Sequence, residues 1–374
     1  MNPKPAMTGS LTLTLIMGFL CNAFSTFGAE EDDVIKIRLS YKIILSQRNH
    51  TRPHLNTPDG KELRDDMIRE VVEEMNAIMA SYWRGYRFEL NEIREIGSLN
   101  GFYPDPSHWF DVDFIQQDKK NKLLRQMEAA IQAYPKHYAW REDAVNIYIN
   151  QATSGAKRKV RDLIVIGADL VSTAWVQLHE LGHYFDLRHT QGDLGVAVPG
   201  RSGEGYTVPG DDDVEDTIKD LPGWSRDEIA KHNFSIAYEK LEAQQKELVD
   251  DVAENIMSYH FLEPVGAGLH RLTEGQLDRW TDTTLDFYRQ KVRDGRTWFV
   301  DHRSFCNEGT SAHPFEAVNL AVEAANNNGG DIILLRPGEY DETVTISKPV
   351  TLRATRKGLA TIGIPFTLTE MSIQ

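Results

Sequence analysis

The sequence predicts an α+β fold over about residues 34–295, followed by a small β-rich segment over residues 311–374. Two kinds of apolar pattern carry this prediction. In VIKIRLSYKIIL, residues 34–45, apolar side chains alternate with polar ones, as in a strand with one buried face. In residues 61–83 they recur at the spacing of an amphipathic helix. Because such strand and helix segments follow one another along the chain, we expect one α+β domain.

The other elements of the larger domain follow in order. YRFELNEI, AVNIYIN and VRDLIVIG predict further strands, and a helix is expected over about residues 119–133. The segment STAWVQLHELGHYF predicts a helix that Ser172 or Thr173 could cap. From Arg188 to about Trp224 the chain is rich in Gly, Asp and Pro, which predicts ordered loops. Two helical patterns complete the domain, over residues 226–256 and 273–292.

Charge and cysteine content limit the possible partners and stabilising bonds. The formal net charge is −15. A nucleic acid partner is therefore not expected, since phosphate binding needs clustered Lys and Arg. Cys21 lies in the leader described next, so a processed chain would keep only Cys306 and could form no intrachain disulfide. Nothing in the sequence indicates an oligomeric state.

The N-terminus has the pattern of a secretory signal peptide. Lys4 precedes an apolar run from Leu11 to Leu20, and small residues follow it up to Ala29. We place the signal peptide at residues 1–28 and expect a secreted or periplasmic protein. An apolar run of about ten residues is too short to span a bilayer, which needs about twenty. No later segment is apolar and long enough either.

The most informative stretch is HELGHYFDLRHT, which starts at His179. His179 and His183 are four residues apart, so on a helix they project from the same side and can hold one ion. Neutral imidazole suits zinc, and three protein ligands leave a position for water, as in catalytic sites. Glu180 is placed to reach that water without being a ligand.

Two residues after the helix are candidates for the third ligand. Asp186 could reach the metal only if the helix continued, and its side chain is short. His189 could reach it if the chain turned back after His183, and this offset matches a known zinc-protease pattern. We therefore expect His189 to be the ligand and Asp186 to occupy a turn position with positive φ, which Asp tolerates.

Four segments together resemble the pappalysin family of metzincin zinc peptidases. They are HELGHYFDLRHTQG, DDDVEDT, NIMSYH and RLTEGQLDRW. The resemblance implies a metzincin-like catalytic domain with a mixed sheet, an active-site helix and a methionine turn. It also implies roles for six residues: zinc ligands His179, His183 and His189, general base Glu180, Met257 below the site and Tyr259 beside the metal.

The chain departs from the pattern of this family in three ways. Asp186 stands where the family has a turn glycine. Asp211 and Ile218 replace the glycine and the proline of the acidic loop. The usual disulfide cysteines of the family are absent.

The acidic segment DDDVEDT has two possible interpretations. It could be a solvated run of charges, which is the usual role of such a run. Clustered oxygens also suit calcium, and some pappalysins bind calcium near this loop. Asp212, Asp216 and Thr217 are therefore candidate calcium ligands.

These features predict a secreted zinc-dependent endopeptidase, in which Glu180 activates a zinc-bound water to attack a peptide bond. We expect a protein or peptide substrate to pair in extended form with an edge strand, AVNIYIN at residues 144–150. The alternative is a weakly active or inactive scaffold that acts as an extracellular or surface binding protein. Glu180 argues against it, because loss of this residue is the simplest way to silence such a site.

The β-rich tail, residues 311–374, has a different character. A helical pattern is followed by short β-rich runs broken by NNNGG, RPGEY and SKP. This resembles the opening cap and first coil of a pectin-lyase-like parallel β-helix. About one coil is present, whereas stacked repeats normally need about three to bury a core.

Overall fold

The computed structural model describes residues 35–55, 60–82, 86–97, 105–114, 122–152, 163–192, 209–258, 271–285, 290–310, 312–327, 330–354 and 359–363. The chain divides into two compact units, one over Ile35–Arg293 and one that includes the residues from Asp294 onward. Residues 1–28, the expected signal peptide, lie outside the described ranges. No helix in the described part of the chain is both long and apolar enough to cross a membrane.

A four-stranded sheet in the order β2–β1–β3–β4 forms the centre of the first unit. The strands are β1 (Ile35–Ile44), β2 (Tyr86–Ile96), β3 (Val145–Asn150) and β4 (Leu163–Gly167). All three neighbouring pairs are parallel, so the expectation of a mixed sheet is wrong for the described strands. Helical crossovers after β1 and β2 return the chain to the same end of the sheet, which makes the next strand parallel.

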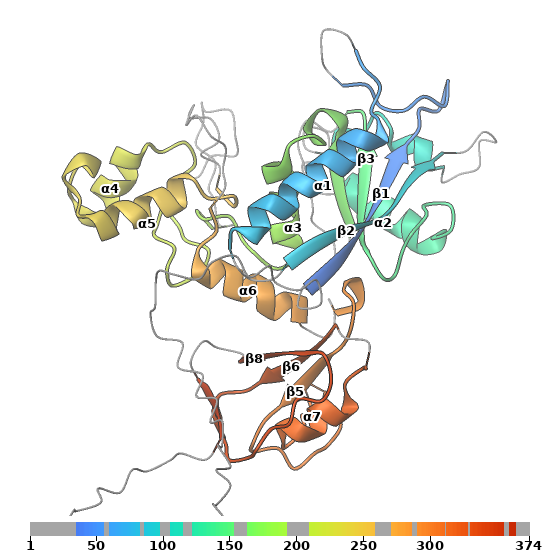
Figure 1. Ribbon diagram of the computed structural model, residues 1–374. Coiled ribbons are helices and arrows are strands. Elements are labelled where there is room, and N and C mark those ends of the chain that lie inside the picture. Colours follow the sequence, from blue (N-terminus) through green and yellow to red (C-terminus); the bar gives the residue numbers. More distant parts are fainter. Residues whose placement is uncertain are drawn as a thin grey trace, which may run out of the picture. The chain divides into compact units, whose positions relative to one another are not determined.

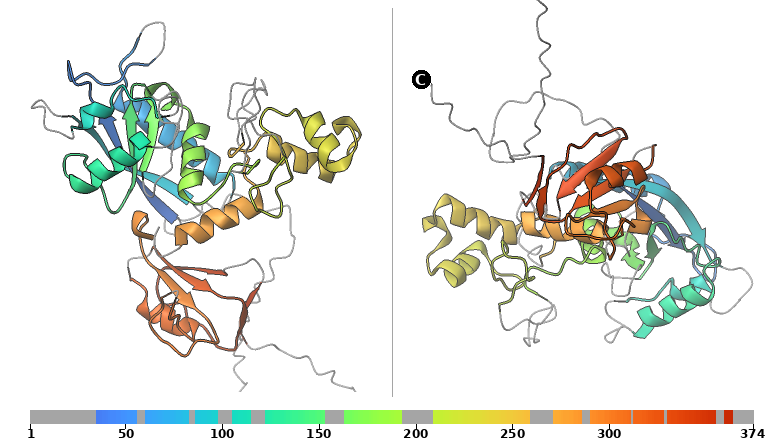
Figure 2. Two further views of the ribbon diagram at one scale, coloured as in Figure 1. Left: turned by 180° about the vertical axis from the view of Figure 1, so that it is seen from behind. Right: turned by 90° about the horizontal axis from the view of Figure 1, so that it is seen from below.

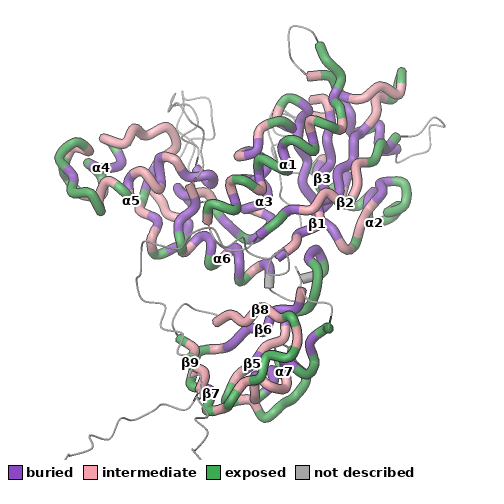
Figure 3. The backbone as a smooth tube through the Cα atoms, viewed as in Figure 1, coloured by how far each residue is buried: buried purple, intermediate pink, exposed green. Residues whose placement is uncertain are grey.

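Helices cover both faces of this sheet (Figures 1 and 2). α1 (Asp65–Ala80) and α3 (Ala174–Tyr184) lie on one face, where the Tyr41 hydroxyl donates to Gln177 of α3 at 2.6 Å. α2 (Lys122–Ala133) covers the other face. Its apolar side packs with side chains of the sheet in one buried cluster, which includes Leu124, Met127, Ile131, Tyr148 and Val165. β1, β3 and β4 are almost wholly buried, whereas the edge strand β2 is partly exposed, as Figure 3 shows.

The strand that was expected to pair with a substrate is not an edge strand. β3 lies between β1 and β4 and is buried along its whole length. Its backbone groups pair with neighbours on both sides. Residues 144–150 therefore cannot take a substrate strand, and the edges of the described sheet are β2 and β4.

A side chain from α1 closes part of the outer edge of β2. Asn76 Nδ2 donates to the Phe88 carbonyl at 3.0 Å, and Phe88 N–H donates to Asn76 Oδ1 at 2.7 Å. The carboxamide thus makes the two bonds that a neighbouring strand would make. Covering an edge in this way disfavours pairing with other chains.

The other elements in the described residues of the first unit are helical. They are α4 (Arg226–Phe234), α5 (Ala243–Ala253), α6 (Glu274–Leu285) and four short 3-10 turns, Pro106–Trp109, Ala168–Leu170, Tyr238–Lys240 and Gln290–Val292. The helical pattern of residues 226–256 is divided between α4 and α5, because Ser235 adopts a left-handed conformation (φ +59°) and ends α4. α4 begins with a capping box made by Ser225 and Glu228.

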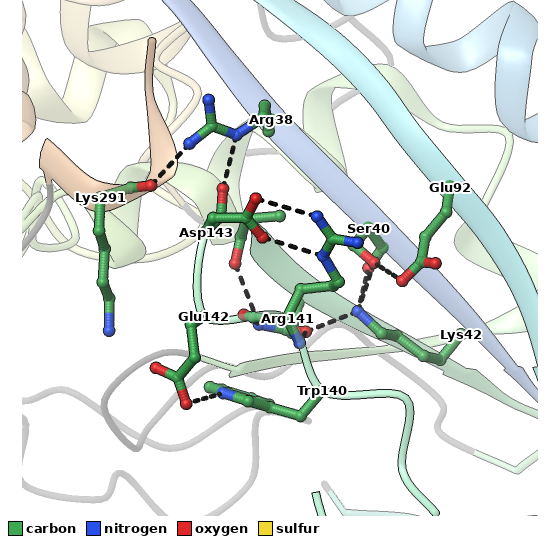
Figure 4. Close-up of polar contacts among 11 residues, drawn as sticks. Arg38, Ser40, Lys42, Glu92, Trp140, Arg141, Glu142, Asp143 and Lys291 are labelled. Carbon is green, nitrogen blue, oxygen red and sulfur yellow. Dashed lines mark hydrogen bonds and ion pairs between the residues drawn. The ribbon is translucent and has the colours of Figure 1, made fainter. Parts of the chain in front are cut away.

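A lysine is buried within the sheet (Figure 4). Lys42 Nζ donates to the Ser40 carbonyl at 3.0 Å, to Ser40 Oγ at 2.6 Å and to Asn146 Oδ1 at 2.6 Å. Ser40 Oγ donates in turn to Glu92 at 2.6 Å. Burial lowers the pKa of Lys42 to about 7, because a charge is unfavourable there.

This lysine gives a prediction about stability and pH. The pKa of Lys42 is about 7 in the folded protein and near the ordinary 10.5 in the unfolded chain, so the folded state binds fewer protons between these values. The free energy of unfolding from this group therefore rises with pH in that window. Against Lys42→Met, we expect the wild type to gain about 2 kcal/mol between about pH 7 and about pH 9. Urea unfolding at both values measures this, and a constant difference would contradict the lowered pKa.

In its described residues, the second unit consists of two small parallel sheets and one helix. β5 (Thr297–Val300), β6 (Asp331–Leu335) and β8 (Val350–Ala354) form one sheet, and β7 (Gly338–Tyr340) pairs with β9 (Ala360–Ile362). The helix is α7 (Val318–Ala324). Because β5 pairs with β6, the tail begins before residue 311, where the sequence placed its start.

The chain of this unit passes between its sheets twice in the same order, from β6 to β7 and then from β8 to β9. The sequence predicted about one such coil. The side chains enclosed by these passes form one apolar cluster with α7, which includes Val300, Val318, Val322, Ile333, Leu335 and Tyr340.

Candidate metal centre

The helix α3 follows β4 and carries two of the three histidines. Thr173 is its N-cap residue, but neither the expected Thr173 nor Ser172 caps it through a side chain, since the N-cap makes no such hydrogen bond. His179 and His183 lie one turn apart, and Glu180 is buried beside them. The helix therefore presents two imidazoles on one side.

The turn after α3 is a Schellman motif with Asp186 at its left-handed position. Leu187 N–H donates to the Gly182 carbonyl at 2.8 Å, and Asp186 N–H donates to the His183 carbonyl at 3.3 Å. Asp186 has φ +67°, which confirms the conformation predicted from the sequence. A non-glycine residue in this region costs about 1 kcal/mol. The turn reverses the chain, so His189 can point back to the helix.

The three histidines come together at one point. His183 Nε2 lies 3.0 Å from His189 Nε2, and one nitrogen from each ring lies within 4.8 Å of the others. A tetrahedral zinc with bonds of about 2.1 Å needs its nitrogen ligands about 3.4 Å apart, so the trio fits this metal. Within the described ranges, it is the one group of His, Cys, Asp or Glu with such an arrangement, and Asp186 is not part of it.

Backbone carbonyls hold two of the rings in the orientation that zinc requires. His179 Nδ1 lies 2.7 Å from the Ile256 carbonyl, and His183 Nδ1 lies 2.8 Å from the Leu187 carbonyl. A carbonyl can only accept, so each Nδ1 carries the proton and each Nε2 keeps its lone pair. Burial, and then the nearby His189, lower the pKa of His179 to about 3, which favours the neutral ligand form.

Met257 lies directly against the glycine of the histidine helix. A Cβ atom added to Gly182 would lie 2.5 Å from Met257 Sδ, so only glycine fits there without movement. The turn that carries Met257 is held by Asn255, whose Oδ1 accepts from Met257 N–H at 2.9 Å. Thr190 N–H, next to the third histidine, donates to the Met257 carbonyl at 3.1 Å. Tyr259, the next expected site residue, lies outside the described residues.

This close contact gives a second prediction. We expect Gly182→Ala to destabilise the protein by about 1–3 kcal/mol, because the new methyl group has no space beside Met257. Combined with Met257→Ala, which vacates that space, the loss should be smaller than the sum of the two single losses. Urea unfolding of the metal-free proteins measures all three variants. Strictly additive losses would contradict the contact.

The acidic segment is folded against the start of α6. Asp212 accepts from Val214 N–H at 3.1 Å and from Gln276 Nε2 at 2.8 Å. Asp216 accepts from Thr273 Oγ1 at 2.7 Å and from Gly275 N–H at 2.8 Å. Asp212 is only 1% exposed, so it does not belong to a solvated charge run. Burial raises the pKa of Asp212 to about 6.

Arginines bind the outer side of the same loop. Arg279 donates to the carbonyls of Asp212 and Asp213, each at 2.7 Å, and Arg188 forms an ion pair with Asp213. Thr217, the other candidate calcium ligand, is buried. The loop is thus held by contacts within the chain, and calcium binding by Asp212, Asp216 and Thr217 stays a prediction.

Sequence reasoning missed two residues near the site, Asn255 and Gln276. Asn255 Nδ2 donates to Gln276 Oε1 at 2.9 Å, and both side chains are fully buried. A sequence signal for one of them existed. Thr273 and Gln276 have capping-box spacing, and their side chains bond each other's backbone N–H at 3.1 and 3.2 Å.

Comparisons with known proteins leave the chain without an assigned family. No protein-family model matches it, and no curated protein matches it. Among solved structures, it is similar to Tannerella forsythia mature mirolysin in complex with a cleaved peptide. That similarity has 16% sequence identity and a TM-score of 0.40, and it covers 70% of this chain and 96% of that chain. A likeness at this level does not determine a site or an activity.

Proposed function

We propose that this protein is a zinc-dependent endopeptidase of the metzincin type that resembles the pappalysin family. The convergence of His179, His183 and His189 carries the proposal, because the three nitrogens fit one zinc ion. The contact between Met257 and Gly182 supports it, since a methionine turn below the histidine helix is the second part of the metzincin pattern.

When bound, zinc would supply a Lewis acid that makes a water molecule more acidic and stabilises negative charge on the carbonyl oxygen of the substrate. Glu180 follows His179 directly on α3 and is buried, so its carboxylate is shielded from bulk water. It takes the proton from the attacking water and passes it to the amide nitrogen as the C–N bond breaks. Tyr259 would be a second donor to the carbonyl oxygen.

The proposed substrate is a protein or peptide in extended form. β3 is interior, and β4, the sheet edge beside α3, is buried along its whole length, so we propose an extended substrate without assigning the strand that pairs with it. A secreted or periplasmic location remains part of the proposal, on the pattern of residues 1–28. We also propose that the tail begins a parallel β-helix, because β6 pairs in parallel with β8 and β7 pairs in parallel with β9.

The direct test uses a mixed peptide library. Purified protein is incubated with the library, with and without a zinc chelator, and the products are read by mass spectrometry. We expect cleavage that the chelator stops and added zinc restores. Cleavage that persists after zinc removal would rule out the proposed chemistry.

The alternative is a binding protein built on an inactive zincin scaffold, with the separately packed second unit as the recognition module. The same experiment separates the two functions, because a scaffold would bind zinc and leave the library intact.

Calcium binding is tested by melting the protein with and without added calcium. A higher melting temperature that Asp216→Asn abolishes would support a calcium site in the acidic loop.

A further inference from the structure

Three buried side chains connect the acidic loop to the methionine turn. Asn255 Oδ1 accepts from Met257 N–H at 2.9 Å, and Asn255 Nδ2 donates to Gln276 Oε1 at 2.9 Å. Gln276 Nε2 then donates to Asp212 Oδ2 at 2.8 Å. All three side chains are at most 1% exposed. We call this series of hydrogen bonds, from Asp212 through Gln276 to Asn255, the amide relay.

The direction of the amide relay is fixed. A backbone N–H can only donate, so the Met257 end requires the oxygen of Asn255, and its amide nitrogen must face Gln276. Gln276 must then present its own oxygen to Asn255 and its nitrogen to Asp212. Only an acceptor at residue 212 completes the series, and the carboxylate supplies it. Buried polar groups that lose such a partner are costly.

Both ends of the amide relay touch segments that carry or orient zinc ligands. At one end, the turn of Asn255 includes the Ile256 carbonyl, which holds His179 Nδ1 at 2.7 Å. At the other end, the acidic loop packs closely on the residues after His189. A Cβ added to Gly210 would lie 2.3 Å from the Gln191 carbonyl oxygen, and one added to Gly192 would lie 2.7 Å from the Asp211 carbonyl oxygen.

We propose that Gln276 is a positioning residue of the metal centre, which holds the methionine turn and the segment of His189 in register through the amide relay. This inference rests on the proposed function for its zinc site, but it does not need peptide cleavage. Partners outside the ligand shell of zinc sites set the orientation of the ligands, and their loss weakens metal affinity about tenfold to a hundredfold.

The test measures zinc affinity by competition with a chromophoric chelator, on the whole protein. Gln276→Leu removes both bonds of the amide relay together with the bond that Gln276 Oε1 accepts from Thr273 N–H, and we expect zinc to bind about tenfold or more weakly. The matched control is Asn76→Leu, which removes the two-bond carboxamide clamp between α1 and β2. It should lower the melting temperature and leave zinc affinity unchanged. Equal zinc affinity in the two variants would overturn the proposal.

A second pair of variants tests the direction of the amide relay. Gln276→Glu places a carboxylate against that of Asp212, so zinc affinity should fall. Adding Asp212→Asn supplies a donor at the facing position, and the new carboxylate can accept from it and from Asn255. The double variant Gln276→Glu/Asp212→Asn should therefore recover zinc affinity to within a few fold of the wild type. Affinity no better than that of Gln276→Glu would overturn the relay.

These readouts separate the two proposals. A wild type that binds zinc but cleaves no peptide removes the proposed function and leaves the amide relay standing if the variants behave as expected. Cleavage by the wild type with unchanged zinc affinity in Gln276→Leu removes the relay alone. A wild type that binds no zinc removes both.

Discussion

We expect replacement of Glu180 by glutamine to leave zinc bound and to lower peptide hydrolysis by several orders of magnitude. The amide has nearly the same shape as the carboxylate, so the buried position beside His179 should accept it. It cannot take a proton from water, which removes general base catalysis and the later proton transfer to the amine. The rate of peptide cleavage and the zinc content of the same sample are measured together.

The control for this variant is Glu247→Gln on α5, which makes the same chemical change at an exposed position away from the histidines. It should keep wild-type activity. Normal cleavage by Glu180→Gln with one zinc retained would exclude Glu180 as the base. Loss of zinc together with activity would instead make the glutamate part of the metal site.

The second large effect is expected at the third ligand. His189→Ala should weaken zinc binding by orders of magnitude, because two imidazoles remain where three converge within 4.8 Å. Asp186→Gly should keep zinc and raise the free energy of unfolding by up to about 1 kcal/mol, since glycine adopts positive φ without strain. Zinc competition and urea unfolding measure the two effects.

The same two variants can also show that His189 is not the third ligand. Zinc lost in Asp186→Gly and retained in His189→Ala would make the aspartate the ligand and would remove the metzincin assignment. The Schellman turn gives the physical reason to expect otherwise, because the exposed Asp186 serves the reversal of the chain.

Features that depend on neighbouring residues were predictable from the sequence. The spacing of His179 and His183 determines their common side on a helix, and the offset of His189 requires a turn, so the positive φ of Asp186 followed. The strand positions followed from apolar alternation. The same alternation carries no information on strand direction, and the sheet that the family resemblance implied to be mixed is parallel in its described strands.

Features that depend on distant residues were not predictable in this way. The interior position of β3 results from its pairing with β1 and β4, which no local pattern encodes. Asp212 looked like a candidate ligand because its partner Gln276 lies 64 residues further along the chain. From sequence alone, the acidic segment cannot be recognised as a set of carboxylates that bind the start of α6, because that helix lies far along the chain.

The two carbonyls that orient the ligand rings differ greatly in sequence separation, and this has a consequence for folding kinetics. The partner of His183 is four residues away, whereas the partner of His179 is 77 residues away. Local contacts form early and distant ones late, because closing a long loop costs entropy before contacts repay it. During refolding, the nascent helix can therefore capture zinc loosely, and full affinity should appear only when the methionine turn docks. Zinc tightening then reports a step of folding that follows the formation of the local turn.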